Sequence, residues 1–185
     1  MSAYTVLLLA VAAERVAELF VSQRHLRWAR ERAAVESGQG HYPVMVVLHV
    51  GLLVGCLVEV HALDRPFVPW LGWPMLAVVV AAQALRWWCI RTLGPQWNTR
   101  VVVVPGLPLV RRGPYRWLRH PNYVAVVAEG VALPLVHDAW LTALVFTVLN
   151  AGLLRVRMRC ENRLLAEVAA PSVGQPARDR LASDR

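Results

Sequence analysis

Five apolar segments, each close in length to a membrane-spanning helix, dominate this sequence. They cover residues 3–22, 44–63, 70–90, 122–136 and 139–158. A helix needs about 20 mostly apolar residues to cross the hydrocarbon core of a bilayer. The composition agrees, because 57% of the 185 residues are hydrophobic, which exceeds the roughly 45–50% of an ordinary soluble domain. The sequence therefore predicts an all-α integral membrane bundle of about five transmembrane helices.

The order of the segments adds detail to this prediction. The fourth segment is short and contains Pro134, so we expect the last two helices to form a tight hairpin that turns at His137 and Asp138. Residues 1–167 are predicted to form a single domain, and residues 168–185 a disordered polar tail. No basic region precedes the first segment and "ERVAELF" continues its helical pattern, so it is predicted to be a span and not a signal peptide.

The arginines lie between alternate apolar segments, which orients the predicted helices. All 20 cationic residues are arginine, and most fall within residues 23–43, 91–121 or 159–185. Because cytoplasmic segments carry the excess of positive charge, the N-terminus is predicted to lie outside and the C-terminus in the cytoplasm. A composition rich in Ala, Val and Arg without lysine is more typical of a GC-rich genome than of a binding preference. The arginines border apolar runs and form no single basic domain, which argues against a nucleic-acid partner.

The three cysteines give no sign of a disulfide framework or of a metal site. Cys56, Cys89 and Cys160 are odd in number and show no paired C-x-x-C spacing. That spacing is typical of zinc sites. We therefore expect no metal in this protein.

Polar and charged residues occur within the apolar segments or at their ends. They are Glu14, Arg15, Glu18, His49, Glu59, Gln83, Arg86, Glu129, Asn150 and Arg155. Such groups are costly in a bilayer, so they usually face the bundle interior and pair there. Arg15 and Glu18 have the i,i+3 spacing of a helical ion pair. Together these residues predict a polar interior, which a pore, a carrier or an enzyme with a polar cofactor could use.

The segment "GPYRWLRHPNYV", residues 113–124, concentrates hydrogen-bond donors and aromatic rings at one predicted membrane boundary. Pro121 suits the first turn of the fourth helix, where its missing N–H would be unpaired anyway. The free N–H groups of that turn, beside His120, favour an anionic group. Tyr115, Trp117 and Tyr123 offer ring faces for a flat base or a cation. An aromatic belt with cytoplasmic arginines would explain the same residue types.

A second polar cluster, "RVRMRCENRLL", follows the last apolar segment. Within it Arg157 and Glu161 have i,i+4 spacing and share a helix face. The G-x-Y-x-W-x-R-H-P-x-Y pattern of residues 113–123, followed by "RMRCEN", resembles the isoprenylcysteine carboxyl methyltransferase family of integral membrane enzymes. The N-terminal half resembles the short bacterial branch of that family, which is similar to methyltransferases of alkylpyrones and phenolic lipids. The resemblance covers residues 10–168.

The resemblance implies S-adenosylmethionine as cofactor and a set of residues that hold it. The implied cofactor-binding residues are Leu109, Val110, Tyr115, His120, Pro121, Asn122, Tyr123 and Glu161, with Leu107 and Pro108 as weaker matches. Arg157 would match the arginine that holds the acceptor's carboxylate, and Arg157 and His120 are the implied catalytic residues. The sequence departs from the family at Asn162, where a second glutamate is usual, and at Ala125, where a glycine is common.

The chemistry of methyl transfer is consistent with these residues. The chain has no G-x-G-x-x-G segment, which argues against a soluble Rossmann-type methyltransferase. A carboxylate acceptor needs only positioning, whereas a phenol or enol is helped by a base, for which His120, Glu129 and His49 are candidates. The expected acceptor is a lipid-like molecule that enters from the bilayer, such as a prenylcysteine or an alkylpyrone, and a biosynthetic enzyme is a possible partner. Two alternatives stay open, a nicotinamide-dependent membrane reductase and a small membrane carrier or assembly protein.

Overall fold

Five α-helices build the structure, a computed structural model that describes residues 2–38, 40 and 42–169. They are α1 (Ala3–Arg30), α2 (Tyr42–Ala62), α3 (Pro69–Leu93), α4 (Pro121–Leu135) and α5 (Trp140–Ala169). Each helix contains most of one predicted apolar segment, so the all-α class is confirmed.

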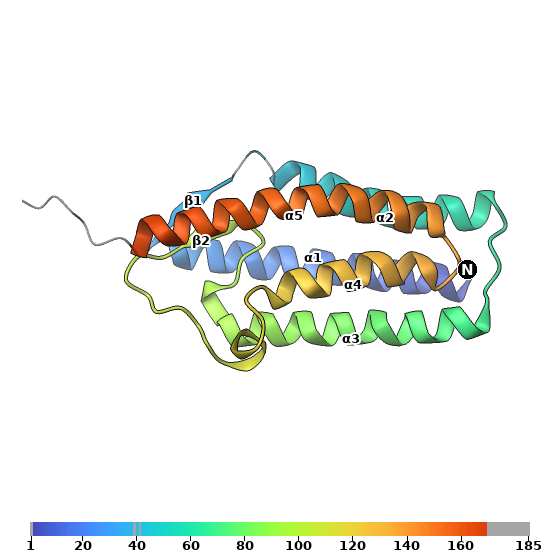
Figure 1. The fold of residues 1–185 in the computed structure, drawn as a ribbon, viewed down its shortest axis with the longest axis horizontal. Coiled ribbons are helices and arrows are strands. Elements are labelled where there is room, and N and C mark those ends of the chain that lie inside the picture. Colours follow the sequence, from blue (N-terminus) through green and yellow to red (C-terminus); the bar gives the residue numbers. More distant parts are fainter. Residues whose placement is uncertain (1, 39, 41, 170–185) are drawn as a thin grey trace, which may run out of the picture.

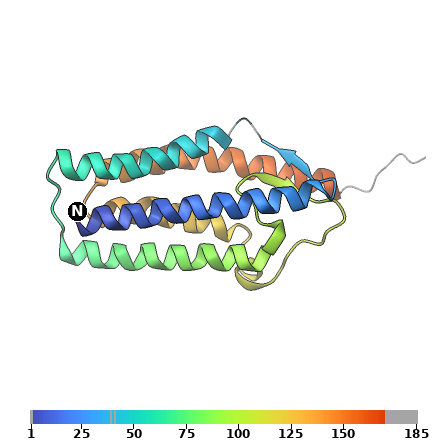
Figure 2. The same cartoon turned by 180° about the vertical axis from the view of Figure 1, so that it is seen from behind.

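Helices that follow one another in the chain run antiparallel along the bundle (Figures 1 and 2). Helices α1, α3 and α5 run toward one end, which we call the sheet end, and α2 and α4 run back from it. Residues 31–38, which follow α1, and residues 94–120, which connect α3 to α4, both lie at the sheet end. The predicted arginine-rich segments therefore gather at one end of the molecule, together with the last turns of α5.

Two helices extend beyond the predicted apolar segments. Helix α1 continues through "QRHLRWAR" to Arg30, with Leu26 and Ala29 buried, and α5 continues to Ala169. Hydropathy marks the apolar part of a helix and not its end, because a helix can leave the bilayer and keep one buried face. Residues 168–169, predicted in the tail, belong to α5, and residues 170–185 lie outside the described residues.

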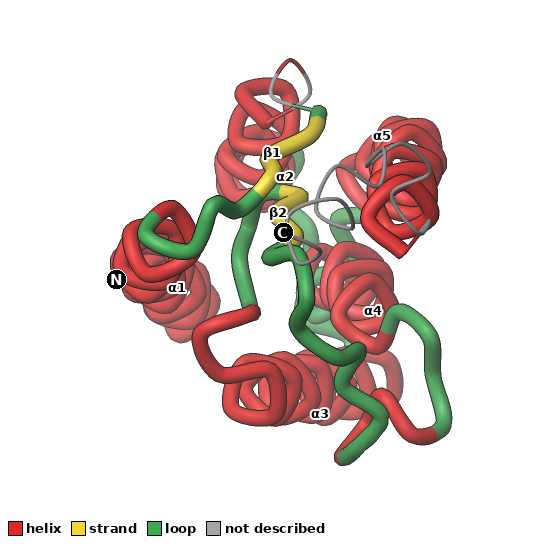
Figure 3. Tube along the Cα trace, turned by 90° about the vertical axis from the view of Figure 1, so that its left-hand side faces the viewer, coloured by secondary structure: helices red, strands yellow, loops and turns green. Residues whose placement is uncertain are grey.

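A small sheet at the sheet end was not predicted. Strand β1 (Val35–Ser37) pairs antiparallel with β2 (Val101–Val103), with Val35 opposite Val103 and Ser37 opposite Val101. Two short 3₁₀ helices, η2 (Gly94–Gln96) and η3 (Gly113–Arg116), lie in the same connection as β2. Strands of three residues are too short to show the alternation by which strands are found in a sequence. Seen from the sheet end, β1, β2 and the chain after β2 lie across the end of the bundle (Figure 3).

Three of the helices are long and apolar enough to cross a membrane. They are α2, α3 together with η2, and α5. Helix α1 carries Glu14, Arg15 and Glu18 within its apolar part, and α4 has only 15 residues. Apolar side chains such as Val47, 71% exposed, cover the outside of α2, as expected for a surface in contact with lipid.

Helices α4 and α5 form the predicted hairpin. They are joined by residues 136–139, where Asp138 has a φ of 54° and so adopts the left-handed conformation of a tight turn. The two helices approach closely, because a Cβ added to Gly130 would lie 2.1 Å from Cε1 of Phe146. Glycine at this position lets the Phe146 ring pack directly on the backbone of α4.

The first turn of α5 is held by a carboxylate from α2. Glu59 accepts hydrogen bonds from the backbone nitrogens of Leu141, at 3.2 Å, and Thr142, at 2.7 Å, and it forms an ion pair with Arg65 at 3.1 Å. A negative charge is favourable at a helix N-terminus, where the backbone N–H groups have no intrahelical partner. Glu59 therefore joins α2 to the start of α5 at the end of the bundle opposite the sheet end.

Candidate active site

A cavity of about 790 Å³ opens at the sheet end of the bundle. Its walls come from the last turn of α3, η2, β2 and the chain after it, η3, the first turn of α4 and the last turns of α5. A volume of this size falls within the roughly 300–1,000 Å³ of small-molecule and cofactor sites. We call it the first cavity.

The first cavity brings together most of the residues that the sequence singled out. It is lined by Leu107, Pro108, Leu109, Val110, Tyr115, His120, Asn122, Tyr123, Arg157 and Glu161. Of the implied cofactor-binding residues, Pro121 does not line the first cavity in the described structure. It is fully buried and begins α4, as predicted for a proline in the first helical turn. The lining also includes Asn162, whereas Ala125 is fully buried in the bundle. The roles of these residues in binding stay predictions.

Glu161 lies at the centre of an aromatic cluster in the first cavity. The Tyr123 hydroxyl donates a hydrogen bond to Glu161 Oε2 at 2.7 Å, and Nδ1 of His120 lies 3.6 Å from Glu161 Oε1. The rings of His120 and Tyr123 are stacked, with centroids 5.3 Å apart and an angle of 16° between their planes. A carboxylate beside two ring faces is an arrangement that favours a bound cation.

Tyr115 adds a third ring from η3. Burial raises the pKa of its hydroxyl, so Tyr115 stays protonated and is a hydrogen-bond donor near neutral pH. The turn that places it begins at Gly113, whose φ of 56° is left-handed and where a Cβ would lie 2.6 Å from Oγ1 of Thr92. Only glycine satisfies both the conformation and the close approach to α3.

Arg157 lies in the bundle one helical turn before Glu161 and is only 6% exposed. Its guanidinium donates to the Thr99 carbonyl at 2.8 Å and contacts the Met45 sulfur at 2.7 Å, while its Nε has no hydrogen-bond partner among the described residues. None of the ion pairs in the described part of the chain includes Arg157. A buried cation without a carboxylate partner is costly, so Arg157 is suited to hold an anionic oxygen of a ligand.

A second cavity, of about 260 Å³, extends from the first into the bundle. The two cavities share Trp97, Asn122, Tyr123 and Arg157. Most other walls of the second cavity are apolar and come from α1, α2 and α5, namely Ala12, Val16, Leu19, Val46, Val50, Leu53, Leu153 and Leu154. Val16 on α1 is 51% exposed and Val50 on α2 is 54% exposed. The second cavity therefore reaches the lipid-facing surface between α1 and α2.

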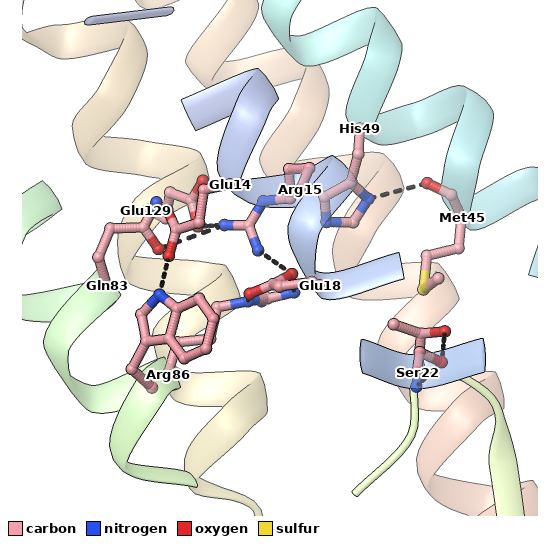
Figure 4. Close-up of polar contacts among 11 residues, drawn as sticks. Glu14, Arg15, Glu18, Ser22, Met45, His49, Gln83, Arg86 and Glu129 are labelled. Carbon is pink, nitrogen blue, oxygen red and sulfur yellow. Dashed lines mark hydrogen bonds and ion pairs between the residues drawn. The ribbon is translucent and has the colours of Figure 1, made fainter. Parts of the chain in front are cut away.

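A buried ion-pair network (Figure 4) contributes Arg15, Glu18 and Arg86 to the wall of the second cavity. Arg15 pairs with Glu129 and, at 2.7 Å, with Glu18, which also pairs with Arg86. Gln83 completes it by accepting from Arg15 at 3.4 Å. The predicted Arg15–Glu18 pair and the predicted polar interior are thus confirmed. The predicted membership of Arg155 is wrong, because this residue is exposed on the outside of α5.

Residues 97–99 contribute to both cavities and were missed by the sequence reasoning. Trp97 lines both, and Thr99 lines the second. Helix α1 holds the segment, because Ser22 Oγ donates to Asn98 Oδ1 at 2.9 Å and the Thr99 backbone nitrogen donates to Ser22 Oγ at 3.1 Å. The only signal in the sequence was the short polar run "QWNT" after an apolar segment, which is too common to indicate a site.

This combination defines a class of protein: a helical integral membrane protein with a polar cofactor-sized cavity that joins an apolar, lipid-facing one. The chain belongs to the isoprenylcysteine carboxyl methyltransferase family, whose pattern it matches over residues 75–167. That range contains the first cavity's motif, both catalytic candidates, all of α4 and most of α3 and α5. Members of this family are membrane methyltransferases that use S-adenosylmethionine as methyl donor.

Two bacterial relatives extend the similarity to the N-terminal helices. The protein named "Uncharacterized protein YpbQ" of Bacillus subtilis is 37% identical over 155 residues, which are 83% of this chain and 91% of the relative. An uncharacterized protein of Haemophilus influenzae is 24% identical over 161 residues, 85% of this chain and 92% of the relative. The N-terminal half is therefore shared with proteins of nearly the same extent.

Proposed function

We propose that this protein transfers a methyl group from S-adenosylmethionine to an oxygen of a lipid-like acceptor. The observation that carries this proposal is the junction of the two cavities at Asn122, Tyr123 and Arg157. One cavity has the larger share of polar and aromatic groups and opens at the sheet end, and the other is mostly apolar and open toward lipid. A polar donor and a lipid acceptor can each reach the junction from the phase in which it dissolves.

The residues of the first cavity fit the cofactor. S-Adenosylmethionine carries a sulfonium cation, which the Glu161 carboxylate and the rings of Tyr123 and His120 would stabilise. Asn122 has a buried Oδ1 without a hydrogen-bond partner in the described chain, and this oxygen is available to a donor group of the ligand. Leu109, Val110 and Tyr115 would cover the flat base, and Pro121 would act indirectly by fixing the start of α4.

Bound in this cavity, S-adenosylmethionine supplies an electrophilic methyl group. The contribution of the protein is then to align an acceptor oxygen with that methyl group, and alignment of two reactants can lower a barrier by about 7–11 kcal/mol. Arg157 is placed for this role, because it borders both cavities and no described residue forms a hydrogen bond with its Nε. A charge-assisted hydrogen bond from Arg157 would position an anionic acceptor oxygen.

The acceptor is proposed to enter from the bilayer between α1 and α2. Half-exposed Val16 and Val50 form the edges of that opening. A prenylcysteine carboxylate and the hydroxyl of an alkylpyrone or phenolic lipid both combine an oxygen with a long apolar tail, and we favour the hydroxyl. We place the sheet end in the cytoplasm of a bacterial plasma membrane, where the cofactor is made and where a biosynthetic enzyme could deliver the acceptor.

Methyl transfer by the purified protein tests the proposal. The protein is reconstituted in lipid nanodiscs with S-adenosylmethionine labelled in its methyl group, and offered an N-acetyl farnesylcysteine or a long-chain alkylpyrone. We expect label in at least one acceptor, released by base from the ester or retained in the ether. Label in neither, from protein that binds S-adenosylhomocysteine, would contradict transfer to these acceptor classes.

A further inference from the structure

His49 occupies a position in the second cavity that the proposed function does not use. It lies on α2 one helical turn after Met45, whose sulfur contacts Arg157. Figure 4 shows its imidazole between the side chains of Arg15 and Met45. The ring meets Phe146 edge-on, with centroids 5.5 Å apart and an angle of 86° between the planes. His49 is therefore held beside the junction of the two cavities.

One hydrogen bond fixes the tautomer of His49. Its Nδ1 lies 2.8 Å from the backbone carbonyl of Met45. A carbonyl oxygen can only accept, so Nδ1 carries the hydrogen and Nε2 of the neutral ring presents a lone pair. His49 can therefore accept a proton at Nε2, because its hydrogen bond to the helix backbone uses Nδ1.

Unpaired polar atoms around the second cavity indicate that its ligand has a polar group. Within the described chain, Arg86, Trp97, Asn122, Asn150 and Arg157 each have a buried side-chain nitrogen or oxygen without a hydrogen-bond partner, and all five line this cavity. Asn150 is 3% exposed and offers its Oδ1. A purely hydrocarbon ligand would leave these atoms unsatisfied, at a cost of about 1–3 kcal/mol each.

We propose that the second cavity binds the head of a hydroxyl acceptor and that His49 is its general base. This inference rests on the proposed function and specifies the acceptor class as a phenol or enol with an apolar tail. The acceptor O–H bond breaks and its proton passes to Nε2 of His49. The oxygen electron pair forms the bond to the methyl carbon, and the methyl–sulfur bond breaks to leave a neutral thioether.

The other two candidate bases are less well placed. Glu129 pairs with Arg15 and lines neither cavity in the described structure. His120 lies 3.6 Å from Glu161 on the cofactor side of the junction. A phenol has an unperturbed pKa of about 10, against about 6.5 for histidine and about 4 for a carboxylic acid. A base therefore assists a hydroxyl acceptor, whereas a carboxylate acceptor arrives already ionised.

Charged groups from the other four helices face this part of the bundle. Arg15 and Glu18 come from α1, Arg86 from α3, Glu129 from α4 and Arg157 from α5. Arg15, Glu18, Arg86 and Glu129 are paired with one another. Arginine keeps its positive charge at every pH used here. Among these groups and His49, the neutral imidazole is therefore the proton acceptor available to a hydroxyl in the second cavity.

The test compares His49→Gln with His61→Gln. Glutamine can still donate to the Met45 carbonyl but cannot take up a proton at neutral pH. His61 is a matched control, because its Nδ1 lies 2.9 Å from the Leu57 carbonyl on the same helix while its side chain is exposed. The rate at saturating cofactor is measured from pH 5 to 9 with two acceptors of equal tail length, an alkylphenol and a fatty carboxylate.

We expect His49→Gln to lower kcat for the alkylphenol by about 10²–10⁴-fold across this pH range, the usual contribution of a general base. Transfer to the carboxylate and binding of S-adenosylhomocysteine are expected to change less than about twofold, as is every activity of His61→Gln. An equal loss with both acceptors, or an unchanged alkylphenol rate, would overturn the role of His49.

A binding measurement separates this inference from the proposed function. A long-chain alkyl nitrophenol, whose phenolate absorbs visible light, is titrated with pH while bound to the protein and S-adenosylhomocysteine. The ionisation midpoint of the bound probe is expected to be lower in the wild type than in His49→Gln by about one pH unit, because His49 holds the proton. Equal midpoints would overturn the proton transfer. Failure of the wild type to methylate either acceptor, despite a shifted midpoint, would instead contradict the methyl transfer.

Discussion

Arg157 and Glu161 lie one helical turn apart on α5, yet each is held by a different partner. Glu161 accepts from the Tyr123 hydroxyl at 2.7 Å, and Arg157 donates to the Thr99 carbonyl at 2.8 Å. A cation and a carboxylate with i,i+4 spacing would ordinarily pair on a helix surface. Here the two charges do not pair with each other and stay available to a ligand. Both line the first cavity, and Arg157 also lines the second.

Substitution of Arg157 is expected to affect the acceptor more than the cofactor. Arg157→Ala removes a charge-assisted hydrogen bond worth about 1.5–3 kcal/mol, so KM for an anionic acceptor should rise about ten- to hundredfold. Arg155→Ala is the control, because Arg155 is exposed two residues earlier on the same helix. Steady-state kinetics measure both variants, and an unchanged KM for a carboxylate acceptor would exclude Arg157 from binding it.

The second cavity can be filled without touching a charged residue. Val46 lines this cavity, whereas its neighbour Val47 is 71% exposed on the outer face of α2. We expect Val46→Phe to lower the affinity for a long-tailed acceptor at least tenfold and to leave binding of S-adenosylhomocysteine unchanged. Val47→Phe should alter neither. Equal affinity of both variants for the acceptor would show that the acceptor's apolar tail binds outside the second cavity.

The buried ion pairs are expected to dominate the stability of the polar interior. Arg86→Ala leaves Glu18 with one of its two arginine partners, and breaking a buried pair typically costs about 3–5 kcal/mol. Unfolding in mixed micelles by denaturing detergent gives the free energy of unfolding. Arg91→Ala, at an exposed site one and a half turns along α3, should stay close to the wild type. A similar small loss of unfolding free energy in both variants would mean that the ion-pair network contributes little to stability.

The close approach of α4 and α5 depends on Gly130. Gly130→Ala would force the Phe146 ring to move, because the new Cβ would lie 2.1 Å from Cε1, and overpacking of this kind costs about 1–3 kcal/mol. Gly152→Ala on α5 places its Cβ more than 4 Å from the other described residues and should not lower stability. The double variant Gly130→Ala/Phe146→Leu should recover part of the loss, and a loss unaffected by Phe146→Leu would contradict this packing.

The helices and much of the first cavity could be predicted because their signals are local. Apolar length set the five segments, and Pro134 with His137 and Asp138 indicated the hairpin that α4 and α5 form. The family motif at residues 113–123 begins α4 at the sheet end, and α5 returns Arg157 and Glu161 to that same end. The alternation of helix direction is what brings these two distant segments into one cavity.

The second cavity and the sheet could not be predicted, because they depend on contacts between distant segments. Ser22 on α1 holds residues 98–99 by hydrogen bonds that no local pattern indicates. The apolar residues of the second cavity, such as Leu53, have the same composition as those that face lipid. Periodicity cannot separate these two faces when the helix is apolar on all sides.

Calorimetric titration with S-adenosylmethionine and S-adenosylhomocysteine tests whether the first cavity is a cofactor site. We expect saturable binding of both by the wild type. Glu161→Gln should weaken binding of S-adenosylmethionine by about ten- to hundredfold, the worth of a charged contact, and binding of the neutral thioether by less. Folding of the variant is checked by its unfolding transition. Absence of binding to the folded wild type, or equal affinities of wild type and Glu161→Gln for the sulfonium, would contradict a cofactor site built around Glu161.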